Sequence, residues 1–270
     1  MMMKRVICAL LLLPLLAVTG CGRPGRGAEI LILSVGKADA ILITRGEHAV
    51  LIDAGEDGDG AYILARLREM NVAGLDAMIV THFDKDHVGG ADWVLEGIPV
   101  GAVYDADYES DSKQYRQYVS AIAGAGIPRH RVRGEVALSF GGLSLTLMPT
   151  ALVSEDENDL CLVVSLSDGF HTFLFMADAT EPRIAELLAN GLSPHDFVKM
   201  PHHGQYKDNL PELLDAVSPR MAAITDSARN PADGKTLRAL AGRGIETCAT
   251  KDGDIWIVSG AKGLVMEPGL

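Results

Sequence analysis

Short runs of apolar residues, separated by glycine, dominate the opening of the chain. Runs at residues 29–35, 40–44 and 49–53 are divided by Gly36 and Gly46. Apolar runs of this length between glycines are typical of strands rather than helices. A further run at residues 77–80 is continuously apolar and predicts a buried strand. The first part of the chain is therefore predicted to form a sheet.

Other segments carry apolar residues at helical spacing. In residues 61–70, for example, Ile63, Leu64, Leu67 and Met70 fall on one face, as expected for an amphipathic helix that packs on a sheet. Patterns of this kind predict helices at residues 61–70, 91–96, 112–125, 181–189, 210–217 and 236–241.

The second half of the chain also alternates strands with helices. Gly141-Gly142 and Asp168-Gly169 each divide two apolar runs, which predicts hairpins at residues 136–147 and 160–177. Further strands are expected at residues 100–104, 197–200, 221–225, 246–250, 255–258 and 263–266. Strands, hairpins and helices thus follow one another in two similar halves, which suits an α+β sandwich of two sheets with helices outside.

The first twenty residues have a different character from the rest. Lys4-Arg5 precedes an apolar stretch at residues 6–18 that is too short to cross a membrane comfortably, as in a signal peptide. Small residues before Cys21 resemble the signal of a bacterial lipoprotein, which implies cleavage ahead of Cys21 and lipid on its sulfur; an ordinary signal peptide is the alternative. We therefore expect a signal peptide at residues 1–20, a tether at 21–28, one domain at 29–270, and a location in the bacterial cell envelope, with Cys21 contacting the membrane.

The side chains best suited to metal binding or catalysis are concentrated in residues 81–90, Thr-His-Phe-Asp-Lys-Asp-His-Val-Gly-Gly. This stretch directly follows the buried strand predicted at 77–80. Open α/β sheets place their sites on such loops, at the carboxyl ends of strands. The pair His82 and Asp84 and the pair Asp86 and His87 cannot easily share one metal, but they can face two neighbouring ions. This arrangement suits a dinuclear hydrolase.

The same stretch resembles the signature of metallo-β-lactamase-fold hydrolases, in the variant found in ComEC-type competence proteins and their free-standing relatives. Pro201-His202-His203-Gly204 and residues 250–255 resemble later motifs of that family, and the resemblance covers residues 29–258. It implies a four-layer αββα sandwich and a metal-dependent hydrolase. The absence of the channel domains implies that DNA transport is not the task of this chain.

The resemblance also implies a set of ligands. One ion would be held by His82, Asp84 and Asp178, and the other by Asp86, His87, Asp178 and either His202 or His203. Supporting positions would be Asp39, Asp53 and Asn158. Asp86 and Asp178 would take part in catalysis, and Lys199 would neutralise a substrate phosphate or else extend toward solvent. Many family members place a further histidine near Asn158, where this chain has none.

Three carboxylates make this site harder than a histidine-rich one, so we expect two divalent ions, Zn or Mn, with Mn(II) supporting activity at least as well as Zn(II). The formal charge is −12, and removal of residues 1–20, which hold Lys4 and Arg5, lowers it to −14. A strongly acidic protein repels polyanions on average, which favours small substrates over long DNA.

Three functions remain open at this stage. The first is hydrolysis of phosphodiesters, with DNA as one candidate substrate. The second is hydrolysis of a non-nucleic ester, a lactone or a β-lactam, and the third is a metal-binding lipoprotein without catalysis. No protein partner can be inferred. Isolated histidines, His48, His130, His171 and His195, are expected at the surface or in turns, and Cys161 and Cys248 as free thiols.

Overall fold

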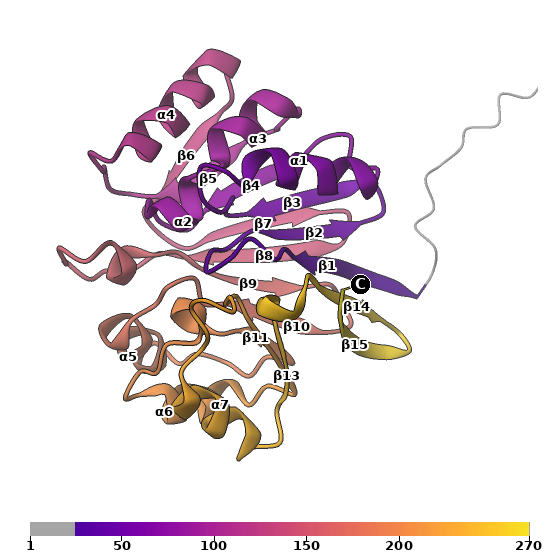
Figure 1. Ribbon diagram of the computed structural model, residues 1–270, viewed down its shortest axis with the longest axis vertical. Helices are drawn as coiled ribbons and strands as arrows, with labels where there is room; N and C mark the ends of the chain where they lie inside the picture. The colour runs from indigo at the N-terminus through magenta and orange to yellow at the C-terminus, as the bar shows by residue number, and fades with distance from the viewer. Residues whose placement is uncertain (1–24, 270) are drawn as a thin grey trace, which may run out of the picture.

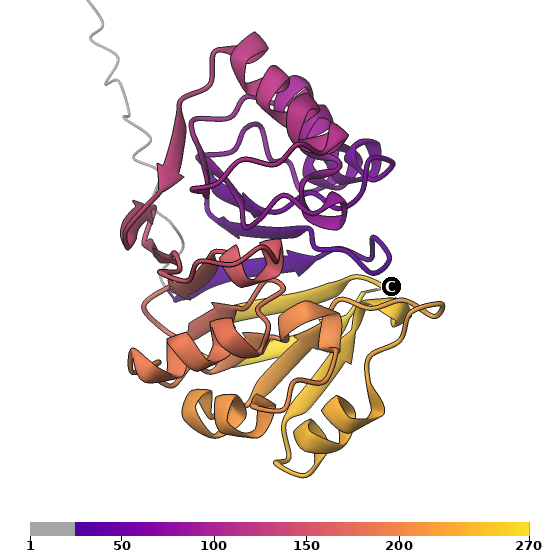
Figure 2. The ribbon, with the colours of Figure 1, turned by 90° about the vertical axis from the view of Figure 1, so that its left-hand side faces the viewer.

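The computed structural model describes residues 25–269, so the proposed signal peptide and Cys21 lie outside the described residues. The chain forms two sheets packed face to face, with helices on both outer faces (Figures 1 and 2). This is the expected four-layer α+β sandwich. Among the described residues, no helix has both the length and the apolar composition that a membrane crossing requires.

The first sheet has eight strands in the order β15-β14-β1-β2-β3-β4-β5-β6. Their bounds are β1 (Arg26–Ile32), β2 (Ile41–Arg45), β3 (His48–Ile52), β4 (Ala77–Val80), β5 (Val103–Ala106), β6 (Arg129–Val132), β14 (Ile255–Gly260) and β15 (Gly263–Pro268). Strand β1 begins at Arg26, three residues before the expected start of the domain, because Arg26 pairs with Gly260 and Ala28 donates its N–H to Asp168.

The second sheet has seven strands in the order β13-β12-β11-β10-β9-β8-β7. Their bounds are β7 (Val136–Phe140), β8 (Leu143–Met148), β9 (Val163–Ser167), β10 (Thr172–Phe175), β11 (Phe197–Lys199), β12 (Met221–Ile224) and β13 (Glu246–Ala249). Residues 157–160 form a short 3₁₀ helix, η1 (Glu157–Leu160), so the second hairpin is shorter than expected.

Helices cover the two outer faces. Those on the first sheet are α1 (Gly60–Glu69), α2 (Lys85–Val88), α3 (Ala91–Gly97) and α4 (Lys113–Ala125). Those on the second half are α5 (Glu181–Ala189), α6 (Leu210–Val217) and α7 (Gly234–Ala241), with 3₁₀ turns η2 (Pro201–Gly204) and η3 (Thr250–Asp252).

Three apolar layers explain why so many strands are continuously apolar. In β4, Ala77 and Ile79 enter the core between the sheets, whereas Met78 and Val80 pack under the helices of the first half. The helices of the second half cover a third core. Strands with both faces buried need apolar side chains at every position, and each polar residue directly after such a strand then lies at the sheet edge.

Candidate metal centre

Four loops bring polar side chains to one edge of the sandwich. Asp53 follows β3, residues 81–87 follow β4, Asp178 follows β10, and His202-His203 follow β11. Neighbours β3 and β4 run parallel, as do β10 and β11, so their carboxyl ends lie at the same edge of each sheet.

The backbone of these loops is strained. Asp53, Ala177, His202 and His203 have positive φ angles of 57°, 46°, 47° and 55°. A residue other than glycine adopts this conformation only where its surroundings impose it, and such residues cluster at functional sites. Gly89 and Gly90 allow the loop after β4 to approach the loop after β3: a Cβ on Gly90 would lie 2.4 Å from the carbonyl oxygen of Ala54.

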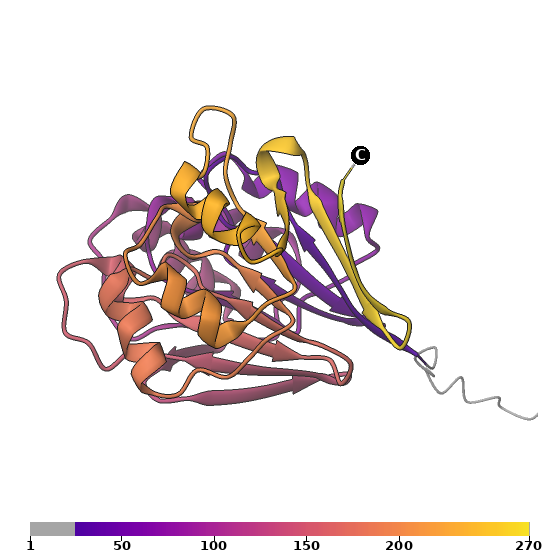
Figure 3. The same ribbon diagram turned by 90° about the horizontal axis from the view of Figure 1, so that it is seen from below.

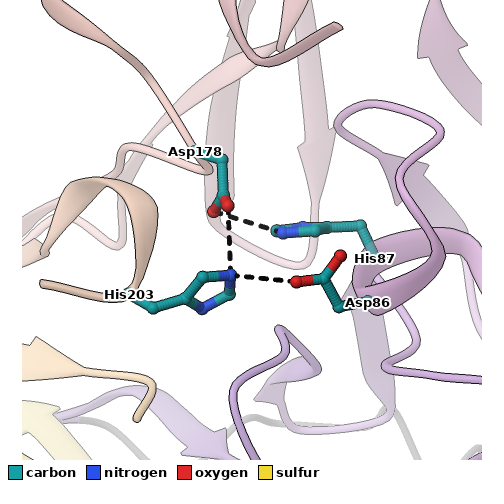
Figure 4. Close-up of side chains that lie close together, drawn as sticks. All are labelled: Asp86, His87, Asp178 and His203. Atoms are coloured by element: carbon teal, nitrogen blue, oxygen red, sulfur yellow. Dashed lines mark ion pairs between the residues drawn. The ribbon is translucent and has the colours of Figure 1, made fainter. Parts of the chain in front are cut away.

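Asp86, His87, Asp178 and His203 form a compact group whose ligand-type atoms all lie within 4.8 Å of one another (Figure 4). His203 Nε2 lies 3.0 Å from Asp178 Oδ2 and 3.4 Å from Asp86 Oδ2, and His87 Nε2 lies 3.2 Å from Asp178 Oδ1. Asp178, from the second half of the chain, therefore stands between imidazoles that come from both halves.

The orientation of each imidazole is fixed through its Nδ1. Asp53 accepts from His87 Nδ1 at 2.8 Å, Thr225 Oγ1 lies 3.0 Å from His203 Nδ1, and Thr81 Oγ1 lies 3.0 Å from His82 Nδ1. Thr81 donates its own hydroxyl to Asp53, so it accepts from His82. Outer partners of this kind hold metal-binding histidines in one tautomer.

The Nε2 atoms of all three histidines are buried and make no hydrogen bond of good geometry, although those of His87 and His203 lie close to Asp178. His82 Nε2, His87 Nε2, His203 Nε2 and Asp178 Oδ1 are buried polar atoms without a hydrogen-bond partner. Buried polar atoms are normally paired, and a group of unpaired lone-pair donors facing one point fits a bound cation. The residues present therefore fit a divalent metal ion.

The electrostatics of the group also favour positive charge. Burial raises the pKa of Asp178, but His203 and His87 beside it outweigh burial and hold that pKa well below its usual value. Burial lowers the pKa of His87, yet Asp178 and Asp53 raise it well above the ordinary value. The carboxylates therefore favour positive charge at this point, and a divalent cation would replace the proton that they stabilise on His87.

The expected first-ion set is less compact. His82 Nε2 lies 3.7 Å from Asp84 Oδ2, and the Asp84 side chain is 40% exposed. Burial and the nearby Asp86 raise the pKa of Asp84 to about 6. Among residues 25–269, His82, Asp84 and Asp178 do not form a group with mutual reach. Asp86, His87, Asp178 and His203 thus form a compact set of candidate ligands that His82 and Asp84 do not join.

The histidine pair has two different environments. His203 is buried within the compact group, whereas His202 Nε2 lies 3.7 Å from Asp178 and its side chain is 18% exposed. Burial lowers the pKa of His202 to about 4. The geometry thus brings His203 into the ligand set and leaves His202 at its margin.

Lys199 has a different surrounding from the one expected. Its ammonium is completely buried, pairs with Asp39, lies 3.8 Å from Asp178 Oδ1 and donates to the carbonyl of Ala177. A group enclosed in this way is not placed to meet a substrate phosphate, and it does not extend toward solvent. Lys199 instead supplies positive charge beneath Asp178, and Asp39 in turn lies 3.5 Å from His203 Nδ1.

Of the other positions expected to support the site, one contacts a candidate ligand and one does not. Asp53 is hydrogen-bonded to His87 and Thr81, whereas the side-chain amide of Asn158 donates to Asp156 within the acidic loop. Sequence reasoning missed the supporting role of Thr225, although its place directly after β12 was a usable signal. His195, expected at the surface or in a turn, lies in the irregular segment before β11, but it is only 6% exposed and contacts Ser165 of β9.

Comparison with known proteins gives the family. Recombination protein 2 of Haemophilus influenzae is 27% identical over 205 residues, which are 74% of this chain and 24% of the relative. ComE operon protein 3 of Bacillus subtilis is 26% identical over 161 residues, 58% of this chain and 20% of the relative. The chain thus spans about a quarter or less of the length of these relatives.

Solved structures share the fold. A diphosphatase of the PhnP family superposes with a TM-score of 0.51 at 15% identity, covering 82% of this chain and 94% of that one. Residues 33–224 match the metallo-beta-lactamase superfamily. That match spans most of the chain, and together with the ComEC-type relatives it shows that this chain belongs to the metallo-beta-lactamase superfamily.

Proposed function

We propose that this chain is an exported, lipid-anchored hydrolase that uses divalent cations, Zn or Mn, to cleave phosphodiesters. The observation that carries the proposal is the compact, largely buried group of Asp86, His87, Asp178 and His203, whose ligand-type atoms all lie within 4.8 Å of one another. The diphosphatase of the PhnP family, which shares the fold, supports phosphorus chemistry. The lipid anchor rests on the sequence that precedes Cys21.

The roles of the side chains follow from their contacts. A divalent cation bound here would supply Lewis acidity and an activated water. His87 and His203 would hold it through Nε2, with their rings fixed by Asp53 and Thr225. Asp178 contributes two oxygens between these imidazoles, and Asp86 places a carboxylate at the more open side. Lys199 balances the carboxylate charge from below and keeps Asp178 in position.

The acidic surface bears on the substrate. A formal charge of −12 repels long polyanions, so we propose small phosphodiesters as the favoured class and nucleic acid as the less favoured one.

The test begins with protein stripped by a chelator and reloaded with Zn(II) or Mn(II). We expect hydrolysis of bis-p-nitrophenyl phosphate to exceed that of single-stranded DNA and of nitrocefin, with Mn(II) at least as effective as Zn(II). Asp86→Ala should lose activity, and Asp208→Ala, at an exposed position, should keep it. Hydrolysis of nitrocefin alone would move the substrate class away from phosphodiesters, and no turnover with any metal would contradict an enzymatic role.

A further inference from the structure

A pocket of about 450 Å³ lies away from the metal centre, on the outer side of the second sheet. Its floor is formed by Thr146 of β8 and Ser165 of β9, and its walls by Leu187 of α5 and by the turn at residues 190–195. Leu145, Leu147 and Leu166 point into the core between the sheets, so Thr146 and Ser165 point outward. A pocket of this size can hold a small organic molecule.

The pocket and the metal centre are separate. His195 precedes β11, whereas Lys199 ends β11 and His203 follows it. The two sites therefore lie at opposite ends of the same strand, which extends about 3.3 Å per residue. A ligand in the pocket would not contact the metal ligands.

Ser165 and His195 form a hydrogen-bonded pair at the floor of this pocket. Ser165 Oγ lies 2.7 Å from His195 Nε2, and His195 Nδ1 lies 2.8 Å from the carbonyl oxygen of Ser193. A carbonyl oxygen can only accept, so Nδ1 carries the proton and a neutral ring leaves Nε2 with a lone pair. The Ser165 hydroxyl then donates to Nε2. This is the tautomer that a general base needs in order to activate a serine.

The surroundings of the pair suit that role. His195 is buried, and burial lowers its pKa, which keeps the ring neutral at neutral pH. Ser165 is only partly buried and lines the pocket, so its oxygen is accessible from there. Asn190 lines the same pocket and carries an amide, a donor type that stabilises developing oxyanions.

The lining indicates which molecules would fit. Met148, Leu187 and Leu192 give the walls an apolar character. Arg183 also borders the pocket, but its guanidinium is bound to Glu186 and to the carbonyl oxygens of Met148 and Cys161. Glu135 adds a carboxylate to the lining, so an anionic ligand is disfavoured, and the apolar walls suit an uncharged ligand with a short apolar group.

We propose that Ser165 and His195 are a second, metal-independent site that transfers the acyl group of small uncharged esters. Ser165 Oγ would bond to the ester carbonyl carbon while the bond to the alcohol oxygen breaks. The serine proton would pass through His195 Nε2 to the departing alkoxide. Water would then attack the acyl-serine, release the carboxylic acid and return the proton to Ser165.

The test uses the full chain in excess chelator, which removes any metal-dependent reaction. The protein is treated with diisopropyl fluorophosphate, and modified residues are mapped by mass spectrometry; p-nitrophenyl butyrate serves as the ester substrate. We expect a single adduct on Ser165, formed at least about tenfold more slowly in His195→Gln, because general bases contribute factors of about 10²–10⁴. Ser165→Ala should abolish both labelling and ester hydrolysis.

Ser144→Ala is the matched control, because Ser144 is an exposed serine on the same outer face of the neighbouring strand. It should label and hydrolyse like the unmodified protein. The mapping on unmodified protein decides the proposal even if a variant fails to fold: absence of an adduct on Ser165 overturns it. An adduct whose rate is unchanged in folded His195→Gln also overturns it, since the pair would then be a structural hydrogen bond only.

Discussion

Residues that would bind no cation themselves decide how the candidate ligands point. Asp53 is fully buried and accepts from the N–H and hydroxyl of Thr81 and from His87 Nδ1. Thr225 has the corresponding place beside His203. Since an imidazole has two nitrogens, occupation of Nδ1 leaves Nε2 as the one available to a metal. Asp53 and Thr225 thus determine which nitrogen of His87 and of His203 faces the site.

The two adjacent histidines give a sharp comparison at this scale. His203→Ala should lower metal affinity by more than about 100-fold, because loss of a supporting residue alone costs about 10–100-fold. His202→Ala should lower it far less, because His202 lies at the margin of the group. Calorimetric titration of the metal-free variants with Mn(II) and Zn(II) measures both affinities. A larger loss of affinity in His202→Ala than in His203→Ala would show that His202, and not His203, is the ligand.

Lys199 supports a prediction about stability. In metal-free protein, Lys199→Met leaves Asp39 buried without its cation, and breaking a buried ion pair costs about 3–5 kcal/mol. Urea unfolding measures this change in the free energy of unfolding. Lys85→Met, at a side chain that is 70% exposed, should change it by less than about 0.5 kcal/mol.

The double variant Asp39→Leu with Lys199→Met checks the cause. Removing both charges leaves no unpaired ion, so most of the lost stability should return. If the double variant is as unstable as Lys199→Met, packing rather than charge explains the loss.

The sequence could place Lys199 at a strand end, but its partner Asp39 is 160 positions away. Only the folded chain decides whether such a lysine faces solvent or a carboxylate.

At the scale of elements, the sequence was most informative where strands are buried on both faces. The continuous apolar run of β4 is followed at once by the metal-binding motif, and β10 and β11 are followed after two further residues by Asp178 and by His202-His203. Strand β6 was missed because Arg129-His130-Arg131 carries polar side chains, as an edge strand can. Strand β6 is held by its backbone pairing with β5, which the pattern of apolar residues does not reveal.

Tyr108 joins three elements around the metal-binding loop. Its hydroxyl accepts from the N–H of Phe83 at 2.8 Å and donates to Glu157 in η1 at 3.0 Å, and its ring packs 4.7 Å from that of Phe83. Burial followed by the charge of Glu157 raises the pKa of Tyr108, so the hydroxyl keeps its proton and remains a donor. The loop that carries His82 and Asp84 is thereby tied to the acidic loop.

Tyr108→Phe should keep the ring contact and lose both hydrogen bonds. We expect a loss of about 1–3 kcal/mol in the free energy of unfolding, since the N–H of Phe83 loses its partner, together with a several-fold weaker affinity for the second metal equivalent. Urea unfolding and metal titration give the two values. Tyr206→Phe, whose ring lies over Lys235 instead, is the control and should leave metal affinity unchanged. An equal change in both variants would argue against a specific role of Tyr108.

At the scale of the whole molecule, the chain enters the fold at the end opposite to the metal centre. Arg26 pairs with Gly260, so the start of β1 lies beside the tip of the β14-β15 hairpin (Figures 1 and 3). Asp53 follows the other end of the sheet, where Ile52 pairs with Ile41 and Ile41 with Ile32. The strands of the first sheet therefore separate the entry point of the chain from the site.

This polarity predicts an orientation at the membrane if Cys21 carries lipid as we propose. Five residues from Cys21 to Arg26 reach at most about 18 Å, so we expect the hairpin tip at Lys262 to lie nearer the bilayer than the metal centre. Fluorophores on Lys262→Cys or Asp208→Cys, each in a Cys248→Ser background, would be compared in vesicles containing a headgroup quencher. Quenching should be stronger at position 262, because Asp208 follows β11 at the edge that carries the site. Stronger quenching at position 208 would contradict this orientation and would mean that the site faces the bilayer.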